Sequence, residues 1–185
     1  MTLESLTAQG WQAKRHTLTT SQTYLWGILF SLPFVLLAGG IYRMLLLHRA
    51  VLLDRTGLIL LAVIIVSVPL HEALHGFGWK LAGRLHKGDV TFFLRSGIPM
   101  CACRTILSTK DYLIGTLLPF FILGGGSFLF LFLCPGTISV LTALVNLMLP
   151  GADLAISWRV LRSEAALIAD NPEGAGFIGL VKNQE

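Results

Sequence analysis

The amino-acid sequence predicts an all-α polytopic membrane protein with four transmembrane helices. Two observations support this prediction: an unusually apolar composition, and uncharged runs long enough to cross a bilayer. Hydrophobic residues make up 54% of the 185 residues and charged residues only 13%, about half the charged share of an average soluble domain. The mean hydropathy is +0.73, and a soluble domain of this length cannot bury so much apolar surface in one core. This composition excludes a disordered chain, a nucleic-acid-binding module and an ordinary cytosolic enzyme.

The first two predicted spans cover residues 24–47 and 57–79. The first is uncharged until Arg43, and the second is uncharged until it reaches Glu72. At about 1.5 Å per residue the second span is roughly 34 Å long, which is enough to cross a bilayer.

The third and fourth predicted spans, residues 112–133 and 138–158, come from one uncharged run that extends from Tyr112 to Ala152. This run is too long for a single crossing. The segment Cys134-Pro135-Gly136-Thr137 divides it, because proline ends a helix and glycine permits a tight turn. The fourth span carries Asp153 near its end.

The segments before and after the four spans are polar. Residues 1–23 lack the apolar core and cleavage site of a signal peptide, so we expect a cytoplasmic N-terminal segment. Residues 159–185 contain Asn171-Pro172-Glu173-Gly174, a turn signal, and we expect a loose cytoplasmic tail.

The distribution of basic residues predicts the orientation. Four helices place both termini and the loop after the second span on one side, together with 11 of the 14 basic residues. Only Arg43, Arg49 and Arg55 fall on the other side. The positive-inside rule therefore makes the first side cytoplasmic. Tryptophans at the same helix ends form a predicted aromatic belt: Trp26, Trp79 and Trp158.

The loop after the second span, residues 88–105, differs from the rest of the chain. Val90 to Leu94 is β-prone, Ser96-Gly97 is a turn signal, and Ile98 to Thr105 provides a return strand. A β-hairpin fits this pattern, and an irregular amphipathic loop lying on the membrane is the alternative.

The sequence His71-Glu72-Ala73-Leu74-His75 matches H-E-x-x-H. Residues four apart on a helix lie on one face, so both imidazoles point the same way and are spaced to hold Zn²⁺. Glu72 lies beside the first histidine, where it can take a proton from a metal-activated water. Ionisable groups inside a span are costly and indicate function. The alternative is a helix end whose histidines reach into the membrane interface.

Asp153 is the only other acid inside a predicted span, which makes it the candidate third ligand. His71 lies 14 residues into the second span and Asp153 lies 15 residues into the fourth, roughly 21 and 22 Å deep. Both spans run in the same direction, so the two side chains should be level near the cytoplasmic face. The alternative is a carboxylate at a helix end, paired with Arg159 or Arg162.

Three other side chains are candidates for supporting roles. Asn146 lies about two turns before Asp153, where its amide could stabilise an oxyanion or form a hydrogen bond between helices. Cys101 and Cys103 are either additional soft ligands or plain loop thiols, because their C-x-C spacing is not that of a zinc ribbon.

H-E-x-x-H in a span, followed two spans later by Asn146-Leu-Met-Leu-Pro150-Gly-Ala-Asp153, resembles the site-2-protease type of intramembrane metalloprotease. That group carries an N-x-x-P-x-P-x-L-D-G segment. Here only the asparagine, one proline and the aspartate correspond, and glycine precedes the aspartate by two positions.

Residues 55–160 are more similar to the small bacterial zincin peptidases of the DUF3267 family. The similarity rests on HEALH, on Pro99-Met-Cys-Ala-Cys103, on Leu107-Ser-Thr-Lys-Asp-Tyr112 and on Leu118-Pro119. It implies one Zn²⁺ per chain, held by His71, His75 and Asp153, with Glu72 as catalytic acid and base. It also implies a bacterial plasma membrane.

The sequence thus predicts a zinc-dependent intramembrane endopeptidase that cleaves a membrane-embedded or membrane-proximal peptide bond. Catalytic roles fall to Glu72 and Asn146. The expected partners are the lipid bilayer and a membrane-protein or peptide substrate, with no nucleic acid. In the resemblance-based hypothesis the hairpin pairs with the substrate through Val90, Thr91, Phe92 and Phe93. The alternatives are a non-catalytic zinc-binding sensor or scaffold, and a structural four-helix protein without metal.

Overall fold

The computed structural model describes residues 3–45, 56–95, 97–171 and 174–182. The predicted end of the first span at Leu47, the loop residues Arg49 and Arg55, and Ser96 of the hairpin turn lie outside these ranges. The helices are α1 (Leu3–Ala8), α2 (Thr20–Leu45), α3 (Thr56–Gly83), α4 (Thr109–Pro119), the π-helical turn η1 (Phe120–Gly124), α5 (Gly125–Leu133), α6 (Thr137–Met148) and α7 (Gly151–Leu161). The strands are β1 (Trp11–Thr17), β2 (Val90–Arg95), β3 (Ile98–Cys103), β4 (Leu107–Ser108), β5 (Leu167–Asp170) and β6 (Gly176–Lys182).

The part of the chain that the structure describes contains four helices long and apolar enough to cross a membrane: Thr20–Leu45, Thr56–Gly83, Thr109–Leu133 and Thr137–Leu161. The first two are α2 and α3. The third joins α4, η1 and α5, and the fourth joins α6 and α7. The helix α5 ends and α6 begins on either side of the Cys134–Gly136 break, as the proline and glycine predict.

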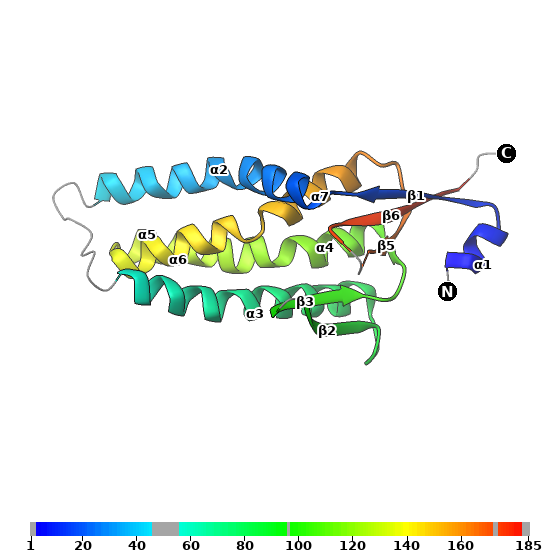
Figure 1. The fold of residues 1–185 in the computed structure, drawn as a ribbon, viewed down its shortest axis with the longest axis horizontal. Helices are drawn as coiled ribbons and strands as arrows, with labels where there is room; N and C mark the ends of the chain where they lie inside the picture. Colours follow the sequence, from blue (N-terminus) through cyan, green and yellow to red (C-terminus); the bar gives the residue numbers. More distant parts are fainter. Residues whose placement is uncertain (1–2, 46–55, 96, 172–173, 183–185) are drawn as a thin grey trace.

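The prediction of an all-α fold is wrong. The described residues form two antiparallel sheets, one with strand order β1-β6-β5-β4 and one made of β2 and β3. The four-stranded sheet lies at one end of the helical bundle, where both chain ends also lie (Figure 1). The tail predicted to be loose therefore contributes β5 and β6, and the N-terminal segment contributes β1.

The apolar residues of the tail explain why it folds. Ile168, Phe177 and Leu180 are fully buried. Ile168 and Phe177 belong to one core cluster with Trp79 and Tyr112 of the bundle. Burying large apolar side chains stabilises such a sheet by about 1.5–3 kcal/mol each. The Asn171–Gly174 turn signal thus connects two strands, although Pro172 and Glu173 themselves lie outside the described residues.

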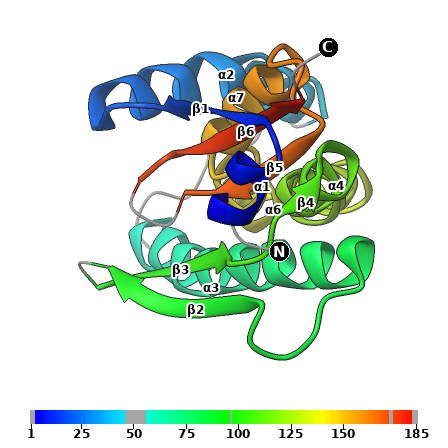
Figure 2. The ribbon, with the colours of Figure 1, turned by 90° about the vertical axis from the view of Figure 1, so that its right-hand side faces the viewer.

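The predicted hairpin is present. Strands β2 and β3 pair antiparallel, with Phe92 opposite Cys101 and Arg95 opposite Ile98. Seen along the bundle, the hairpin lies beside α3 and apart from the four-stranded sheet (Figure 2). Gly76 of α3 makes this packing close, because a Cβ there would lie 2.6 Å from the Phe92 ring and 3.1 Å from Cys101 Sγ.

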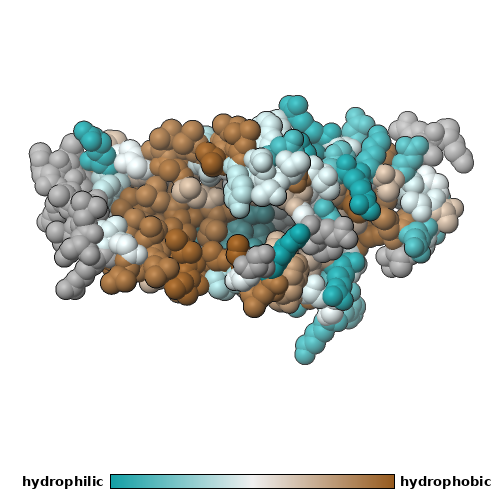
Figure 3. Space-filling view, in the orientation of Figure 1, coloured by the Kyte–Doolittle hydropathy of each residue, from teal (hydrophilic) through white to brown (hydrophobic). Residues whose placement is uncertain are grey.

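The molecular surface divides into an apolar part and a polar part. Apolar side chains cover the helical half, and hydrophilic ones gather toward the end with the sheets (Figure 3). Many leucines and isoleucines of α2 and α3 are more than half exposed, including Leu36, Leu58 and Ile65. Exposed apolar surface of this extent indicates a protein that lies in a membrane.

The three tryptophans of the predicted aromatic belt differ in exposure. Trp26 is 39% exposed and Trp158 is 47% exposed. Trp79 is only 4% exposed because α3 continues past it to Gly83, where the sheets and α4 cover it. The prediction for Trp79 is therefore wrong.

Candidate metal centre

Three potential metal ligands meet where the apolar bundle gives way to the sheets. His71 and His75 lie one turn apart on α3 and are both buried, and Asp153 lies in the first turn of α7. The Nε2 atoms of the two histidines are 3.0 Å apart. One Asp153 carboxylate oxygen, Oδ2, lies 3.1 Å from His71 Nε2 and 3.4 Å from His75 Nε2.

The predicted depth match between α3 and α7 therefore brings the three side chains together. The alternative pairing of Asp153 with Arg159 or Arg162 is not found among the described residues, whose ion pairs to Asp153 come from His71 and His75.

The spacing of the three atoms fits a tetrahedral zinc ion. Zinc binds imidazole nitrogen and carboxylate oxygen at about 2.0–2.2 Å, so two such ligands at a tetrahedral angle lie about 3.3–3.6 Å apart. The observed separations of 3.0–3.4 Å are close to this. The donor set of two imidazoles and one carboxylate is also that of catalytic zinc sites, which leave a fourth position for water.

The hydrogen bonding of His75 prepares its Nε2 for a metal. His75 Nδ1 lies 3.0 Å from the carbonyl oxygen of Gly115, an arrangement in which Nδ1–H donates and leaves the Nε2 lone pair free. Metal-binding histidines commonly hold their second nitrogen in this way. On its other side the His75 ring stacks on Trp79, with the centroids 5.4 Å apart, and Trp79 stacks in turn on Tyr112.

Gly115 leaves room for this stack, because a Cβ on residue 115 would collide with the Trp79 ring. The substitution Gly115→Ala is expected to displace Trp79 and to cost about 1–3 kcal/mol of stability. Gly125→Ala is the matched control, since a Cβ there meets no atom within 4 Å. We expect thermal unfolding in detergent to show a lowered midpoint for Gly115→Ala alone. Equal midpoints would contradict the assigned role of Gly115.

Glu72 is held by the hairpin. Its Oε2 atom accepts a hydrogen bond of 2.7 Å from the backbone N–H of Cys101 in β3. Since Glu72 lies between the two histidines in sequence and lines the same cavity as His75 and Asp153, its carboxylate is fixed beside the ligand set.

The two loop cysteines do not join the ligand set. Among the described residues, the group able to hold a metal consists of His71, His75 and Asp153. Burial raises the pKa of the Cys101 thiol to about 12, and the Glu72 carboxylate beside it adds to this shift. Burial likewise raises the pKa of Cys103 to about 11. Free thiols with such pKa values stay protonated at neutral pH, in contrast to the thiolates that bind metals.

Asn146 is placed deeper in the bundle than the predicted catalytic role suggests. It is 5% exposed, and its side-chain oxygen has no hydrogen-bond partner among the described residues. It is not among the residues that line the metal cavity. The helix is interrupted at Leu149-Pro150, between α6 and α7, so counting turns from Asn146 to Asp153 does not hold.

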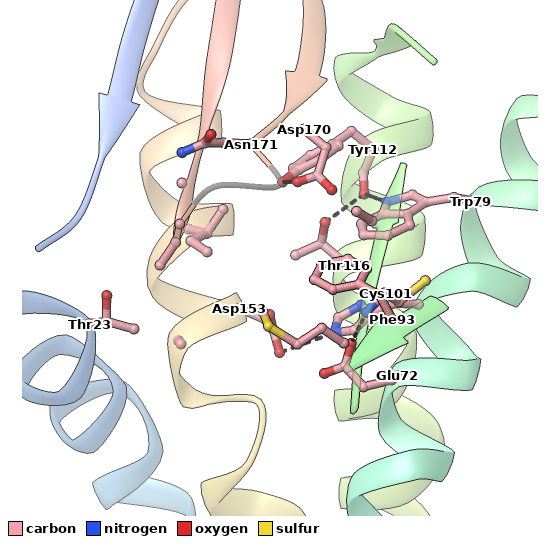
Figure 4. A pocket seen from close by; sticks show the side chains of 18 residues that line it. Thr23, Glu72, Trp79, Phe93, Cys101, Tyr112, Thr116, Asp153, Asp170 and Asn171 are labelled. Atoms are coloured by element: carbon pink, nitrogen blue, oxygen red, sulfur yellow. Dashed lines mark hydrogen bonds and ion pairs between the residues drawn. The ribbon is translucent and has the colours of Figure 1, made fainter. Parts of the chain in front are cut away.

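Two of the candidate ligands, His75 and Asp153, line a cavity of about 230 Å³. Its wall includes residues from three membrane-length helices and from both sheets: Glu72, Phe93, Cys101, Tyr112, Asp153 and Asp170 (Figure 4). Of the four predicted substrate contacts, Phe93 lines this cavity. The other three, Val90, Thr91 and Phe92, do not line it.

Asp170 is a site residue that the sequence analysis missed. It ends β5, and its Oδ2 atom accepts a hydrogen bond of 3.0 Å from Cys103 N–H. Its Oδ1 atom accepts one of 3.2 Å from the Tyr112 hydroxyl. Burial raises the pKa of Asp170, and these two hydrogen bonds oppose the shift. The sequence signal for Asp170 is its position, because it is an acidic residue between a short apolar run and the Asn171–Gly174 turn signal.

The Asp170 carboxylate joins the C-terminal sheet to β3, the strand that holds Glu72. Asp170→Ala leaves two buried donors without an acceptor, and each is expected to cost about 1–3 kcal/mol. Asp170→Asn keeps a carbonyl oxygen for one donor and should cost about half as much. Thermal unfolding of both variants in detergent checks this order. Midpoints equal to that of the wild type would contradict it.

Residues 64–168, more than half of the chain, match the DUF3267 family, whose description is "putative zincin peptidase". Comparisons with curated proteins and with solved structures gave no match. The matched segment contains HEALH, the hairpin and Asp153, that is, the complete ligand set and Glu72.

Proposed function

The chain belongs to the DUF3267 family of zincin peptidases, and we propose that it is a zinc-dependent intramembrane endopeptidase. One observation carries the proposal. The carboxylate of Glu72, the imidazole of His75 and the carboxylate of Asp153 line one cavity at the polar end of four membrane-length helices. This is the residue set for metal-assisted peptide hydrolysis.

Three side chains of this protein would hold the zinc ion: His71, His75 and Asp153. When bound, zinc supplies Lewis acidity, which lowers the pKa of water and polarises a carbonyl group. Glu72 accepts a proton from the attacking water while the water oxygen forms a bond to the carbonyl carbon of the substrate. Glu72 then gives that proton to the amide nitrogen as the C–N bond breaks. The Cys101 N–H keeps one Glu72 oxygen in place throughout.

An apolar groove supports a substrate that lies in the membrane. It has a volume of about 460 Å³ and lies between α2, which contributes Tyr24 and Ile28, and α3, which contributes Ile64. Thr23 and Ala152 line both this groove and the metal cavity. The groove therefore adjoins the metal cavity, and we propose that an apolar substrate segment approaches Glu72 from it.

The edge of the hairpin that faces the site belongs to β3. The N–H groups of Cys101 and Cys103 point away from β2, since they donate to Glu72 and Asp170. These two N–H groups are therefore already in use, and Pro99, the other residue that points outward on this edge, has no N–H. The outer edge of β2 pairs with no other described strand, so the proposed pairing of an extended substrate stays with residues 90–93, with Phe93 also a wall of the cavity.

We infer that the end with the sheets faces the cytoplasm. Both chain ends lie there (Figure 1), together with most of the basic residues, as the positive-inside rule requires. The active site then opens near the cytoplasmic face.

The proposal is tested by incubating the purified protein in liposomes with a panel of single-span peptides. New termini are identified by mass spectrometry. We expect cleavage within or beside the apolar segment, stopped by a zinc chelator and restored by added zinc. A protein that binds one zinc per chain but cleaves no peptide in the panel would be the non-catalytic sensor or scaffold instead.

A further inference from the structure

A second cavity lies at the polar end of the bundle, separate from the metal site. Its volume is about 250 Å³, and it shares no lining residue with the metal cavity. Its walls come from β1, from the first half of α2 and from the end of α7. The residues that matter are His16, Trp26, Phe30, Trp158, Arg159 and Arg162.

The polar wall of this cavity carries positive charge without a counter-ion. Arg159 and Arg162 contribute two guanidinium groups, and neither makes an ion pair with an acid among the described residues. The nearest acid in sequence, Glu164, is exposed. An anion is therefore the ligand that this wall lacks, and guanidinium groups bind phosphate oxygens in particular.

His16 provides an unused polar atom on the same wall. Its Nε2 atom is buried and has no hydrogen-bond partner in the described structure. The ring cannot easily turn away, because it stacks on Phe177 with the centroids 4.8 Å apart. Burial, followed by the charges of Arg159 and Lys14, lowers the pKa of His16. A bound anion would compensate the positive charge around His16.

The rest of the lining is largely aromatic. The rings of Trp26, Phe30 and Trp158 follow one another, with centroids 6.1 and 6.4 Å apart. Arg162 lies over the Trp158 ring at 4.4 Å. Phe30 lies ten residues into α2, about 15 Å along the helix. Charge at one end and apolar rings at the other match the two parts of a phospholipid.

We propose that this cavity binds the phosphate of an anionic phospholipid between Arg159, Arg162 and His16, with an acyl chain along Trp26 and Phe30. A soluble phosphate ion would use the charged wall but leave the aromatic wall without a partner. The cavity lies at the helix ends where Trp26 and Trp158 are exposed, which is the depth of lipid headgroups. Basic pockets between membrane helices bind anionic lipids in this position. The proposal does not depend on peptidase activity.

The test is native mass spectrometry of the detergent-purified protein with added phosphatidylglycerol, phosphatidylcholine or inorganic phosphate. We expect one tightly bound phosphatidylglycerol per chain and weaker binding of phosphatidylcholine. The double variant Arg159→Gln/Arg162→Gln should bind phosphatidylglycerol about tenfold more weakly. His16→Phe keeps the aromatic stack and should weaken binding about threefold.

The matched control is Arg95→Gln/Arg104→Gln, which removes the same charge from two exposed hairpin residues. Equal weakening in both double variants would show a general charge effect and overturn the proposal. Displacement of the lipid by millimolar inorganic phosphate would identify a soluble-anion site and overturn it too. Wild-type protein gives a second measurement, because phosphatidylglycerol with brominated chains should quench Trp26 and Trp158 more than brominated phosphatidylcholine does. Equal quenching by both lipids would contradict a selective site.

Discussion

Glu72→Gln is expected to abolish peptide cleavage while the protein still binds one zinc ion. Glutamine has nearly the same shape as glutamate, and its carbonyl oxygen can still accept the hydrogen bond from Cys101 N–H. Its amide cannot accept a proton from water at neutral pH. Removing a general base that acts in both halves of the reaction should lower kcat by at least about 10²–10⁴-fold.

The cleavage rate and the zinc content are both measured on the same preparation of each variant. Glu164→Gln is the matched control, because Glu164 is an exposed acid outside the metal cavity. We expect it to keep the wild-type rate. Turnover by Glu72→Gln within tenfold of the wild type would refute the role of Glu72 as base. Loss of zinc from this variant would instead make Glu72 a ligand.

The grouping of His71, His75 and Asp153 could be predicted from the sequence because it follows from helix periodicity and depth. His71 and His75 are one turn apart on a helix by spacing alone. The position of Asp153 follows from its depth in the membrane. Two helices that cross in the same direction bring residues at equal distances from their starts to the same level. These two rules require no knowledge of tertiary packing, and the observed separation of 3.1 Å between His71 and Asp153 agrees with them.

The sheet could not be predicted in the same way, because its strands depend on partners far apart in the chain. His16 pairs opposite Phe177, and the charged β1 becomes a strand only through the apolar β6 beside it. The polar composition of the segments outside the spans also hides the strands. Asn171–Gly174 is a clear turn signal, but the apolar runs on both sides of it are too short to indicate strands without their partners.

The environment of Glu72 depends on the same long-range contacts. The hairpin was predicted from its β-prone residues, but not that β3 would direct Cys101 N–H to Glu72. The sequence also could not show that Asp170 accepts a hydrogen bond from the N–H of Cys103, which lies two residues after Cys101 in β3. The candidate ligands are thus encoded by helix spacing and depth, whereas the groups that hold the Glu72 carboxylate come from the tertiary fold.

Asp153→Ala is expected to remove zinc from the protein, the second large effect that the geometry predicts. It deletes one of three ligands and leaves two imidazoles, which should weaken zinc binding by more than about 100-fold, since loss of even a supporting residue costs 10–100-fold. Asp170→Ala is the matched control. Asp170 is also a partly buried acid of the same cavity, but it accepts hydrogen bonds from Cys103 and Tyr112 and not from the histidines.

Zinc content after dialysis, measured by mass spectrometry, should be about one per chain in the wild type and in Asp170→Ala, and near zero in Asp153→Ala. Thermal unfolding separates a ligand from a simple ion-pair partner of the histidines. A ligand that binds only the folded protein stabilises it by about 2.7 kcal/mol at 100 times its Kd, so added zinc should raise the midpoint of the wild type and not that of Asp153→Ala. If zinc raised both midpoints equally, Asp153 would serve only as a counter-ion to His71 and His75, and the third ligand would have to come from elsewhere.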